Sequence, residues 1–181
     1  KIPSLLMQTL KNEMLTIQVS EHGAELQSIR KDDYEYLWQG NPEYWGRRSP
    51  VLFPIVGSVW EKCFRVDGKV YEMGQHGFAR DMDFELVSAA DTEVWYRLKS
   101  SEKTLAAYPW PFVLEIGHRL EGNSVKVLWK VTNPGETEMY FQIGAHPAFN
   151  YPGYDPDAVD RGVVAFDGND NLQRSGFKGK G

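Results

Sequence analysis

Residues 140–150 read YFQIGAHPAFN, and this segment, together with the residue before it, has a period of two. Gln142 and His146 fall on one face, while the opposite face carries apolar side chains, namely Met139, Phe141, Ile143 and Ala145. Such alternation is typical of a β-strand with one buried face and one polar face. Pro147 then ends the strand, because proline has no amide hydrogen for a further ladder bond. The sequence therefore predicts a strand that places His146 at its polar end.

The loop after this strand is rich in aromatic residues, since Phe149, Tyr151 and Tyr154 follow His146 closely. An imidazole exchanges protons near neutral pH, and aromatic faces offer flat apolar surfaces to a ring. This combination suits a sugar ring, with Gln142 and Phe149 as candidate contacts. The alternative is that His146 only caps the end of a strand, and residue types alone favour neither interpretation.

The rest of the chain also predicts short strands separated by turns. Alternating apolar residues run through 112–120 and 125–131, and Asp67-Gly68 between two extended segments indicates a hairpin. Residues 101–107 predict one or two helical turns before Pro109. His118 lies among apolar neighbours and is expected to be a core histidine. Strands at this spacing predict an all-β fold, either an antiparallel sandwich or a barrel.

Composition limits the classes of protein that fit. A chain of 181 residues with 41% hydrophobic residues has the size for one domain or for part of a larger one. The net charge of −5, without a lysine or arginine stripe, argues against nucleic acid. A single cysteine, Cys63, excludes an intrachain disulfide and indicates a reducing, cytoplasmic compartment. No apolar run approaches the roughly 20 residues that a membrane span needs.

A second histidine, His76, lies in the segment GQHGFAR at 74–80. Glycines near a histidine let the backbone approach a ligand closely, and Arg80 follows in the same segment. The sequence contains no His-Glu-x-x-His motif, no Cys-x-x-Cys motif and no calcium loop, so we expect no metal and no cofactor. It also lacks a phosphate-cradling glycine motif and a nucleophilic serine motif.

Three segments in this order resemble the aldose 1-epimerase (galactose mutarotase-like) superfamily, and within it the LacX-like branch of bacterial proteins. They are WGRRSPVLFPIVG at 45–57, QHGFAR at 75–80 and IGAHPAFN at 143–150. The resemblance runs from about residue 8 to residue 152. It implies a large antiparallel β-sandwich with a monosaccharide site on a concave sheet face.

The resemblance also implies roles for individual residues. His146 matches the general acid of the family, and His76 matches its second active-site histidine. Arg47 and Arg80 match substrate-binding arginines, although each could instead form an ordinary surface ion pair. The expected reaction is interconversion of the α and β anomers of an aldose, which needs proton transfer and no cofactor.

The general base of the family is a glutamate near the C-terminal end, and residues 1–181 contain no match to it. We therefore expect these residues to form one domain that is the N-terminal part of a larger sandwich, with the base after Gly181. Two other functions stay open. One is a sugar-binding protein without turnover, and the other is an epimerase of a phosphorylated hexose, for which Arg47 and Arg48 offer cations.

Overall fold

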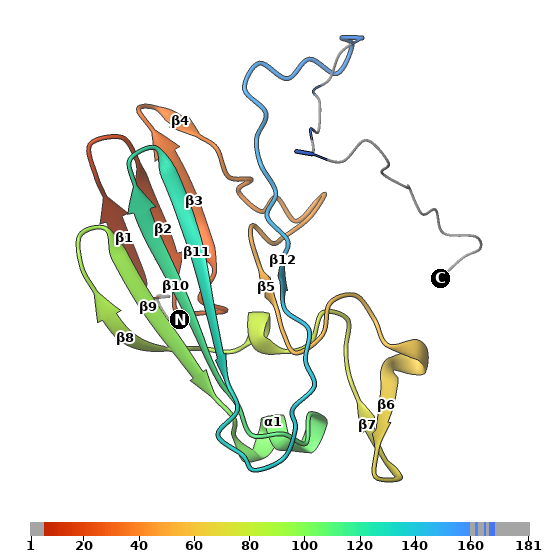
Figure 1. The fold of residues 1–181 in the computed structure, drawn as a ribbon. Coiled ribbons are helices and arrows are strands. Elements are labelled where there is room, and N and C mark those ends of the chain that lie inside the picture. The colour runs from red at the N-terminus through yellow and green to blue at the C-terminus, as the bar shows by residue number, and fades with distance from the viewer. Residues whose placement is uncertain (1–5, 160–161, 163–164, 166, 169–181) are drawn as a thin grey trace, which may run out of the picture. The chain divides into compact units, whose positions relative to one another are not determined.

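The computed structural model describes residues 6–159, 162, 165 and 167–168 (Figure 1). The chain divides into two compact units, residues 1–150 and residues 151–181. The second unit, where the structure describes it, consists of turns, such as the one closed by the Tyr154 amide on the Tyr151 carbonyl at 3.1 Å. All strands and helices described below belong to the first unit.

Two antiparallel four-stranded sheets pack face to face in the first unit, as Figure 1 shows. One sheet has the order β1-β2-β3-β4 and the other has the order β11-β10-β9-β8. Their bounds are β1 Met7–Lys11, β2 Thr16–Ser20, β3 Leu26–Lys31, β4 Tyr34–Glu35, β8 Glu85–Ala89, β9 Glu93–Lys99, β10 Val113–Glu121 and β11 Ser124–Thr132. The all-β sandwich predicted from the sequence is confirmed.

The core between the sheets comes from the alternation of the strands. In β10 the residues Leu114, Ile116 and Leu120 are buried, and they meet side chains of the facing sheet such as Ile17 and Val19. One continuous apolar cluster results, to which both sheets contribute. Burial at about 25 cal/mol per Å² of apolar surface makes this cluster the main source of stability.

Smaller elements connect the sheets and carry the loops of interest. β5 (Val51–Leu52) pairs with β12 (Gly144–Ala145), and β6 (Cys63–Val66) pairs with β7 (Lys69–Glu72) across the Asp67-Gly68 turn. The predicted hairpin is therefore confirmed. Helix α1 (Glu102–Ala107) is also where the sequence predicts it, with Ser101 and Thr104 forming a capping box. Two short 3-10 helices complete the unit, η1 (Trp60–Lys62) and η2 (Ala79–Asp81).

The strand predicted over residues 139–146 is wrong in its extent, because only Gly144–Ala145 forms a strand. The neighbouring segment explains this, since Pro50 and Pro54 flank β5 and neither has an amide hydrogen to donate. Both prolines still accept through their carbonyls: Pro54 accepts from the Gln142 amide at 2.8 Å, and Pro50 accepts from the His146 amide at 3.0 Å. Met139 and Ile143 pack against the core as predicted, while Phe141 and Ala145 are exposed, contrary to the prediction.

The inner face of β11 is less covered than that of β10. Val127 and Trp129 are 38% and 39% exposed, although they pair with the buried residues His118 and Ile116. An apolar cavity of about 500 Å³ lies beside this face and is lined by, among others, Leu26, Ile29, His118, Val125, Val127 and Phe149. The far edge of β11 has no neighbouring strand among the described residues.

His118 is a core histidine, as the sequence predicts, and only 1% of it is exposed. Its Nε2–H donates to the Ala24 carbonyl at 2.9 Å, which joins the two sheets, while Nδ1 has no hydrogen-bond partner among the described residues. Burial lowers the pKa of this imidazole to about 4, and the bond to Ala24 opposes the shift. His118 is therefore neutral at physiological pH.

Candidate functional site

The two histidines singled out in the sequence lie next to each other. The ring centroids of His76 and His146 are 6.0 Å apart, with the ring planes at 67°. His146 directly follows β12, and His76 lies in the turn between β7 and η2. Trp45 contacts the imidazole of His146 as well, with ring centroids 5.0 Å apart. The exposed imidazole of His146 is thus bordered by an aromatic ring and by a second imidazole.

Two hydrogen bonds to Gly57 fix the orientation of His76. The His76 amide donates to the Gly57 carbonyl at 2.7 Å, and the Gly57 amide donates to His76 Nδ1 at 2.9 Å. Because Nδ1 accepts a hydrogen bond, the neutral ring must carry its proton on Nε2. The backbone therefore selects one tautomer, and this tautomer leaves an N–H donor free for a ligand.

The turn that carries His76 needs a left-handed backbone at two successive positions. His76 has φ of +65° and Gly77 has φ of +70°, a region that disfavours residues with a Cβ. A Cβ on Gly77 would lie 2.2 Å from the Phe53 carbonyl oxygen. Glycine is therefore required at position 77, where the turn packs against the segment that leads from β5.

Electrostatics favour the neutral form of His76. Burial is the largest cause that lowers its pKa, and the positive charges of Arg80, His146 and Arg47 lower the pKa further. His76 therefore favours its neutral form, and its neighbour His146 is exposed.

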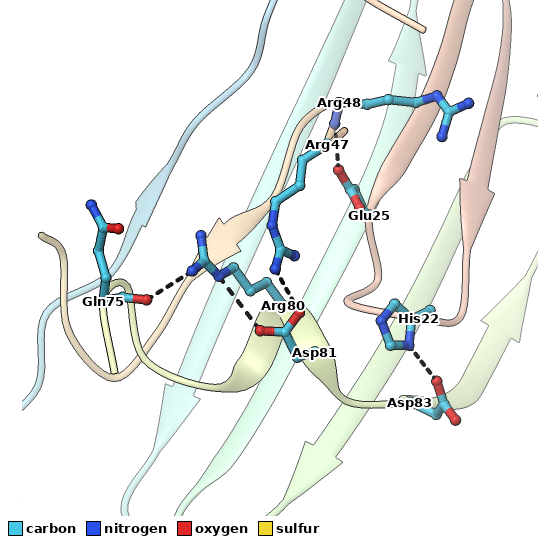
Figure 2. Close-up of polar contacts among 8 residues, drawn as sticks. All are labelled: His22, Glu25, Arg47, Arg48, Gln75, Arg80, Asp81 and Asp83. Carbon is cyan, nitrogen blue, oxygen red and sulfur yellow. Dashed lines mark hydrogen bonds and ion pairs between the residues drawn. The ribbon is translucent and has the colours of Figure 1, made fainter. Parts of the chain in front are cut away.

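Arg47 and Arg80 are joined by one carboxylate, that of Asp81 (Figure 2). Arg47 Nη2 donates to Asp81 Oδ1 at 2.8 Å, and Arg80 Nε lies 3.7 Å from Asp81 Oδ2. Arg80 Nη2 also donates to the Gln75 carbonyl at 2.8 Å, which ties Arg80 to the segment of His76. Both arginines thus form the ion pairs that the sequence left open as an alternative, and both lie close enough to His76 to affect its pKa.

Glu25 fixes the loop that carries the arginines at 47 and 48. Its Oε1 accepts from the Arg48 amide at 3.0 Å and from the Ser49 amide at 2.7 Å, and the residue is buried. The Arg48 side chain turns to Gln27, with Nη1 2.8 Å from Oε1. A carboxylate bonded to two backbone amides holds the chain in place just before β5. Sequence reasoning missed Glu25, because nothing links it to a loop more than about 20 residues away until the sheet has formed.

A polar hollow of about 500 Å³ opens beside these groups, and Glu25, Trp45 and Arg47 are among its lining residues. This volume is within the range of small-molecule sites in proteins. Neither this hollow nor the apolar cavity beside β11, which has a similar volume, is lined by His76 or His146. The hollow shares Trp45 with the surroundings of His146 and Arg47 with the Asp81 ion pair, so we take the hollow and the adjoining histidines as the candidate site.

The remaining predicted contacts, Gln142 and Phe149, lie in different surroundings. Gln142 Oε1 accepts from the Val56 amide at 3.0 Å, so this side chain supports the turn that holds His76. Phe149 forms a backbone bridge with Leu37 and lines the apolar cavity. No ring contact between Phe149 and either histidine of the pair occurs in the described part of the chain. The structure thus brings His76, His146, Arg47 and Arg80 close together. Gln142 bonds to the backbone next to Gly57, the residue that holds His76.

Over the described residues, no group of three or more His, Cys, Asp or Glu side chains has the geometry to hold a metal ion. In the same residues, none of the helices has the length and apolar character for a membrane span.

Comparisons with known proteins agree on one family. The family model described as Aldose 1-epimerase matches residues 7–175. Two curated proteins of Lactococcus lactis subsp. lactis, the chromosomal and the plasmid forms of Protein LacX, are each 40% identical to this chain over 151 residues. The match covers 79% of this chain and 50% of either protein, so the chain spans about half the length of these curated relatives.

Solved structures give the same result. A galactose mutarotase related enzyme from Lactobacillus acidophilus has a TM-score of 0.80 and 40% identity, over 81% of this chain and 50% of that protein. A galactose mutarotase-like protein from Lactobacillus casei ATCC 334 has a TM-score of 0.80 and 37% identity, over 84% of this chain and 52% of that protein.

Proposed function

This chain belongs to the aldose 1-epimerase family, and we propose that it interconverts the α and β anomers of an aldose by opening the sugar ring. The observation that carries the proposal is the His76–His146 pair, in which one imidazole is fixed as a neutral donor and the other is exposed. Family membership supports a reaction of this general class on a sugar.

Anomer exchange needs two proton movements. A base removes the proton from O1 of the hemiacetal while an acid protonates the ring oxygen, and the bond between C1 and the ring oxygen breaks. The C1–C2 bond of the open aldehyde rotates, and the reverse transfers close the ring on the other face. Each step conserves atoms and charge with positioned proton donors and acceptors alone, so no cofactor enters the reaction.

His146 is the residue that we assign as the acid. It is exposed beside Trp45 and next to His76, and the family resemblance matches it to the general acid. An imidazole can both give and regain a proton near neutral pH. Protonating the ring oxygen and recovering that proton on closure are then the two halves of its cycle.

His76 has a different role in this proposal. Its Nδ1 is occupied by the Gly57 amide, and its Nε2–H is the free donor. It therefore donates a hydrogen bond to the ring oxygen or to a hydroxyl without changing its own protonation. Arg47 and Arg80 add N–H donors for further hydroxyls, because a guanidinium has several N–H groups and the described bonds use only some of them.

The base must come from another residue. His76 has no free lone pair in its neutral form, and Asp81 is engaged with two arginines. The family resemblance assigns this role to a glutamate for which residues 1–181 contain no match. A sugar-binding protein without turnover is the second candidate function, because the described site supplies an acid and ligand donors but no unengaged base.

Polarimetry of the full-length protein decides between these two functions. Freshly dissolved α-glucose, α-galactose and other aldoses are followed with and without protein, and binding of each sugar is measured by calorimetry. An enzyme accelerates the optical change for at least one sugar in proportion to protein concentration. Sugar binding without acceleration would contradict the proposed reaction and establish the binding protein instead.

A further inference from the structure

We propose that Asp81 makes the site prefer uncharged sugars to sugar phosphates, because its carboxylate already pairs with both Arg47 and Arg80. The inference rests on the proposed function, since it concerns the sugar site. Its starting point is the arrangement in Figure 2, where the Asp81 carboxylate contacts both guanidinium groups.

The three side chains differ in their exposure to solvent. The Asp81 side chain is 51% exposed, that of Arg47 is 33% exposed and that of Arg80 is 16% exposed. The carboxylate is the most exposed of the three groups, so an anion that approaches the arginines from solvent also meets its negative charge. A phosphate must displace Asp81 from Arg47 Nη2 or bind beside it, and either arrangement places two negative charges close together.

The other charged groups nearby act on the arginine pair without direct contact. Burial lowers the pKa of Arg80, and Glu25 opposes this shift from a distance by favouring the charged form of Arg80. Glu25 bonds to the amides of Arg48 and Ser49, and the Arg48 guanidinium bonds to Gln27. Asp81 is thus the carboxylate in direct ion-pair contact with Arg47 and Arg80 among the described residues. It neutralises one of the two positive charges, and the remaining N–H groups are sufficient for hydroxyls, which carry no charge.

The backbone of η2, rather than the ion pair, fixes the position of Asp81. The Asp81 amide donates to the Phe78 carbonyl at 3.0 Å, and the Ala79 amide donates to the Phe53 carbonyl at 3.1 Å. On the other side, a Cβ on Gly23 would lie 3.0 Å from the Arg80 carbonyl oxygen, so the turn at Gly23 packs directly against η2. Removing the charge of Asp81 therefore leaves the local fold intact.

The test is Asp81→Asn in the full-length protein, with Asp83→Asn as the matched control. Asp83 is two positions away, its side chain is 74% exposed, and it pairs with His22 at 2.7 Å instead of with an arginine. Both variants lose one negative charge from the same segment. The Kd values for glucose, glucose 6-phosphate and inorganic phosphate are measured by calorimetry. A difference between the two variants then shows an effect of the contact between Asp81 and the arginines, and not of net charge.

We expect Asp81→Asn to tighten the Kd for glucose 6-phosphate and for inorganic phosphate by about tenfold at low ionic strength, and by less at about 0.5 M salt. The Kd for glucose should change by less than about threefold, and Asp83→Asn should change none of the three by more than about twofold. Asp81→Glu, which keeps the charge, should bind both phosphates as weakly as the wild type.

Equal effects of Asp81→Asn and Asp83→Asn, or an unchanged affinity for both phosphates in Asp81→Asn, would overturn the inference. So would a wild-type protein that binds glucose 6-phosphate more tightly than glucose. The proposed function fails separately, through the absence of any sugar binding or turnover by the wild type. In that case, comparing the Kd for inorganic phosphate between the wild type and Asp81→Asn still tests whether Asp81 weakens anion binding at the arginines.

Discussion

His76 and Gly57 exchange two hydrogen bonds, from the His76 amide to the Gly57 carbonyl at 2.7 Å and from the Gly57 amide to His76 Nδ1 at 2.9 Å. This reciprocal pair explains how a histidine in an open loop keeps one ring orientation and one tautomer. The ring is a fixed donor in the candidate site, next to the exposed imidazole of His146.

The tautomer of His76 can be observed directly. Nitrogen chemical shifts of the imidazole should show the Nε2–H form at neutral pH, and the pKa of His76 should lie below 6.5, because burial and the charges of Arg80, His146 and Arg47 all disfavour the cation. Titration by two-dimensional NMR measures both properties. An Nδ1–H tautomer would contradict the assigned hydrogen bond from Gly57, and a pKa above 6.5 would contradict the electrostatic account of the pair.

Substitution of His146 should separate catalysis from folding. His146→Gln in the full-length protein should lower the rate of mutarotation by about 10²–10⁴-fold, the range that loss of a general acid produces. The melting temperature should change little, because the His146 side chain is exposed and the segment is held by its amide bond to the Pro50 carbonyl. Near-normal turnover with correct folding would remove His146 from the role of acid.

Gly77→Ala should destabilise the protein much more than a comparable glycine substitution elsewhere. The added Cβ meets the Phe53 carbonyl at 2.2 Å in a backbone with φ of +70°. We therefore expect a loss of about 3 kcal/mol or more in unfolding free energy.

Gly68→Ala is the control, because Gly68 has φ of +78° but nothing within 4 Å of the position that the new methyl group would take. The control should lose only about 1–2 kcal/mol. Urea unfolding measures both, and equal losses would mean that backbone strain alone requires glycine at position 77.

The buried His118 should make stability depend on pH. Its pKa is lowered from 6.5 to about 4 in the folded state, so the folded state resists protonation more than the unfolded state does. The contribution to stability is complete above pH 6.5 and is lost as the pH falls towards 4. The total loss is roughly 3 kcal/mol, since one pKa unit corresponds to about 1.4 kcal/mol.

His118→Gln removes the titrating group and keeps an N–H that can reach the Ala24 carbonyl. This variant should show a flatter dependence of unfolding free energy between pH 6.5 and pH 4. His22→Gln, at an exposed turn, is the control and should leave the wild-type slope in place. If His118→Gln kept the full slope, other groups would have to be responsible for it.

Much of the fold follows from local pattern. The alternation through 112–120 predicts the buried positions of β10, and Asp67-Gly68 predicts the β6–β7 hairpin, because both depend on residues close together in the chain. The extent of the strand at 139–146 depends instead on its partner. The period of two in that segment carries no information about Pro50 and Pro54, which limit the ladder on the opposite side.

Some residues of the candidate site could likewise be predicted from the sequence, and others could not. The prediction of His76, His146, Arg47 and Arg80 rests on three segments that resemble a known family, and the structure brings all four together. The bridging position of Asp81 and the support from Glu25 could not be predicted, since each depends on side chains that meet only after the sheets pack. The sequence predicts Phe149 as a contact because it closely follows His146, whereas in the structure its side chain lines the apolar cavity.

The bond between the Val56 amide and Gln142 Oε1 joins residues 86 positions apart, and the β5–β12 pairing closes a loop of similar length. Closing such a loop costs conformational entropy before any contact within it forms, which makes it a late event in folding. The hairpins of the two sheets need far shorter loops. We therefore expect a folding intermediate, or an early stage during synthesis, in which both sheets exist while His76 and His146 are still apart, so that ligand-binding competence appears after most of the β-structure has formed.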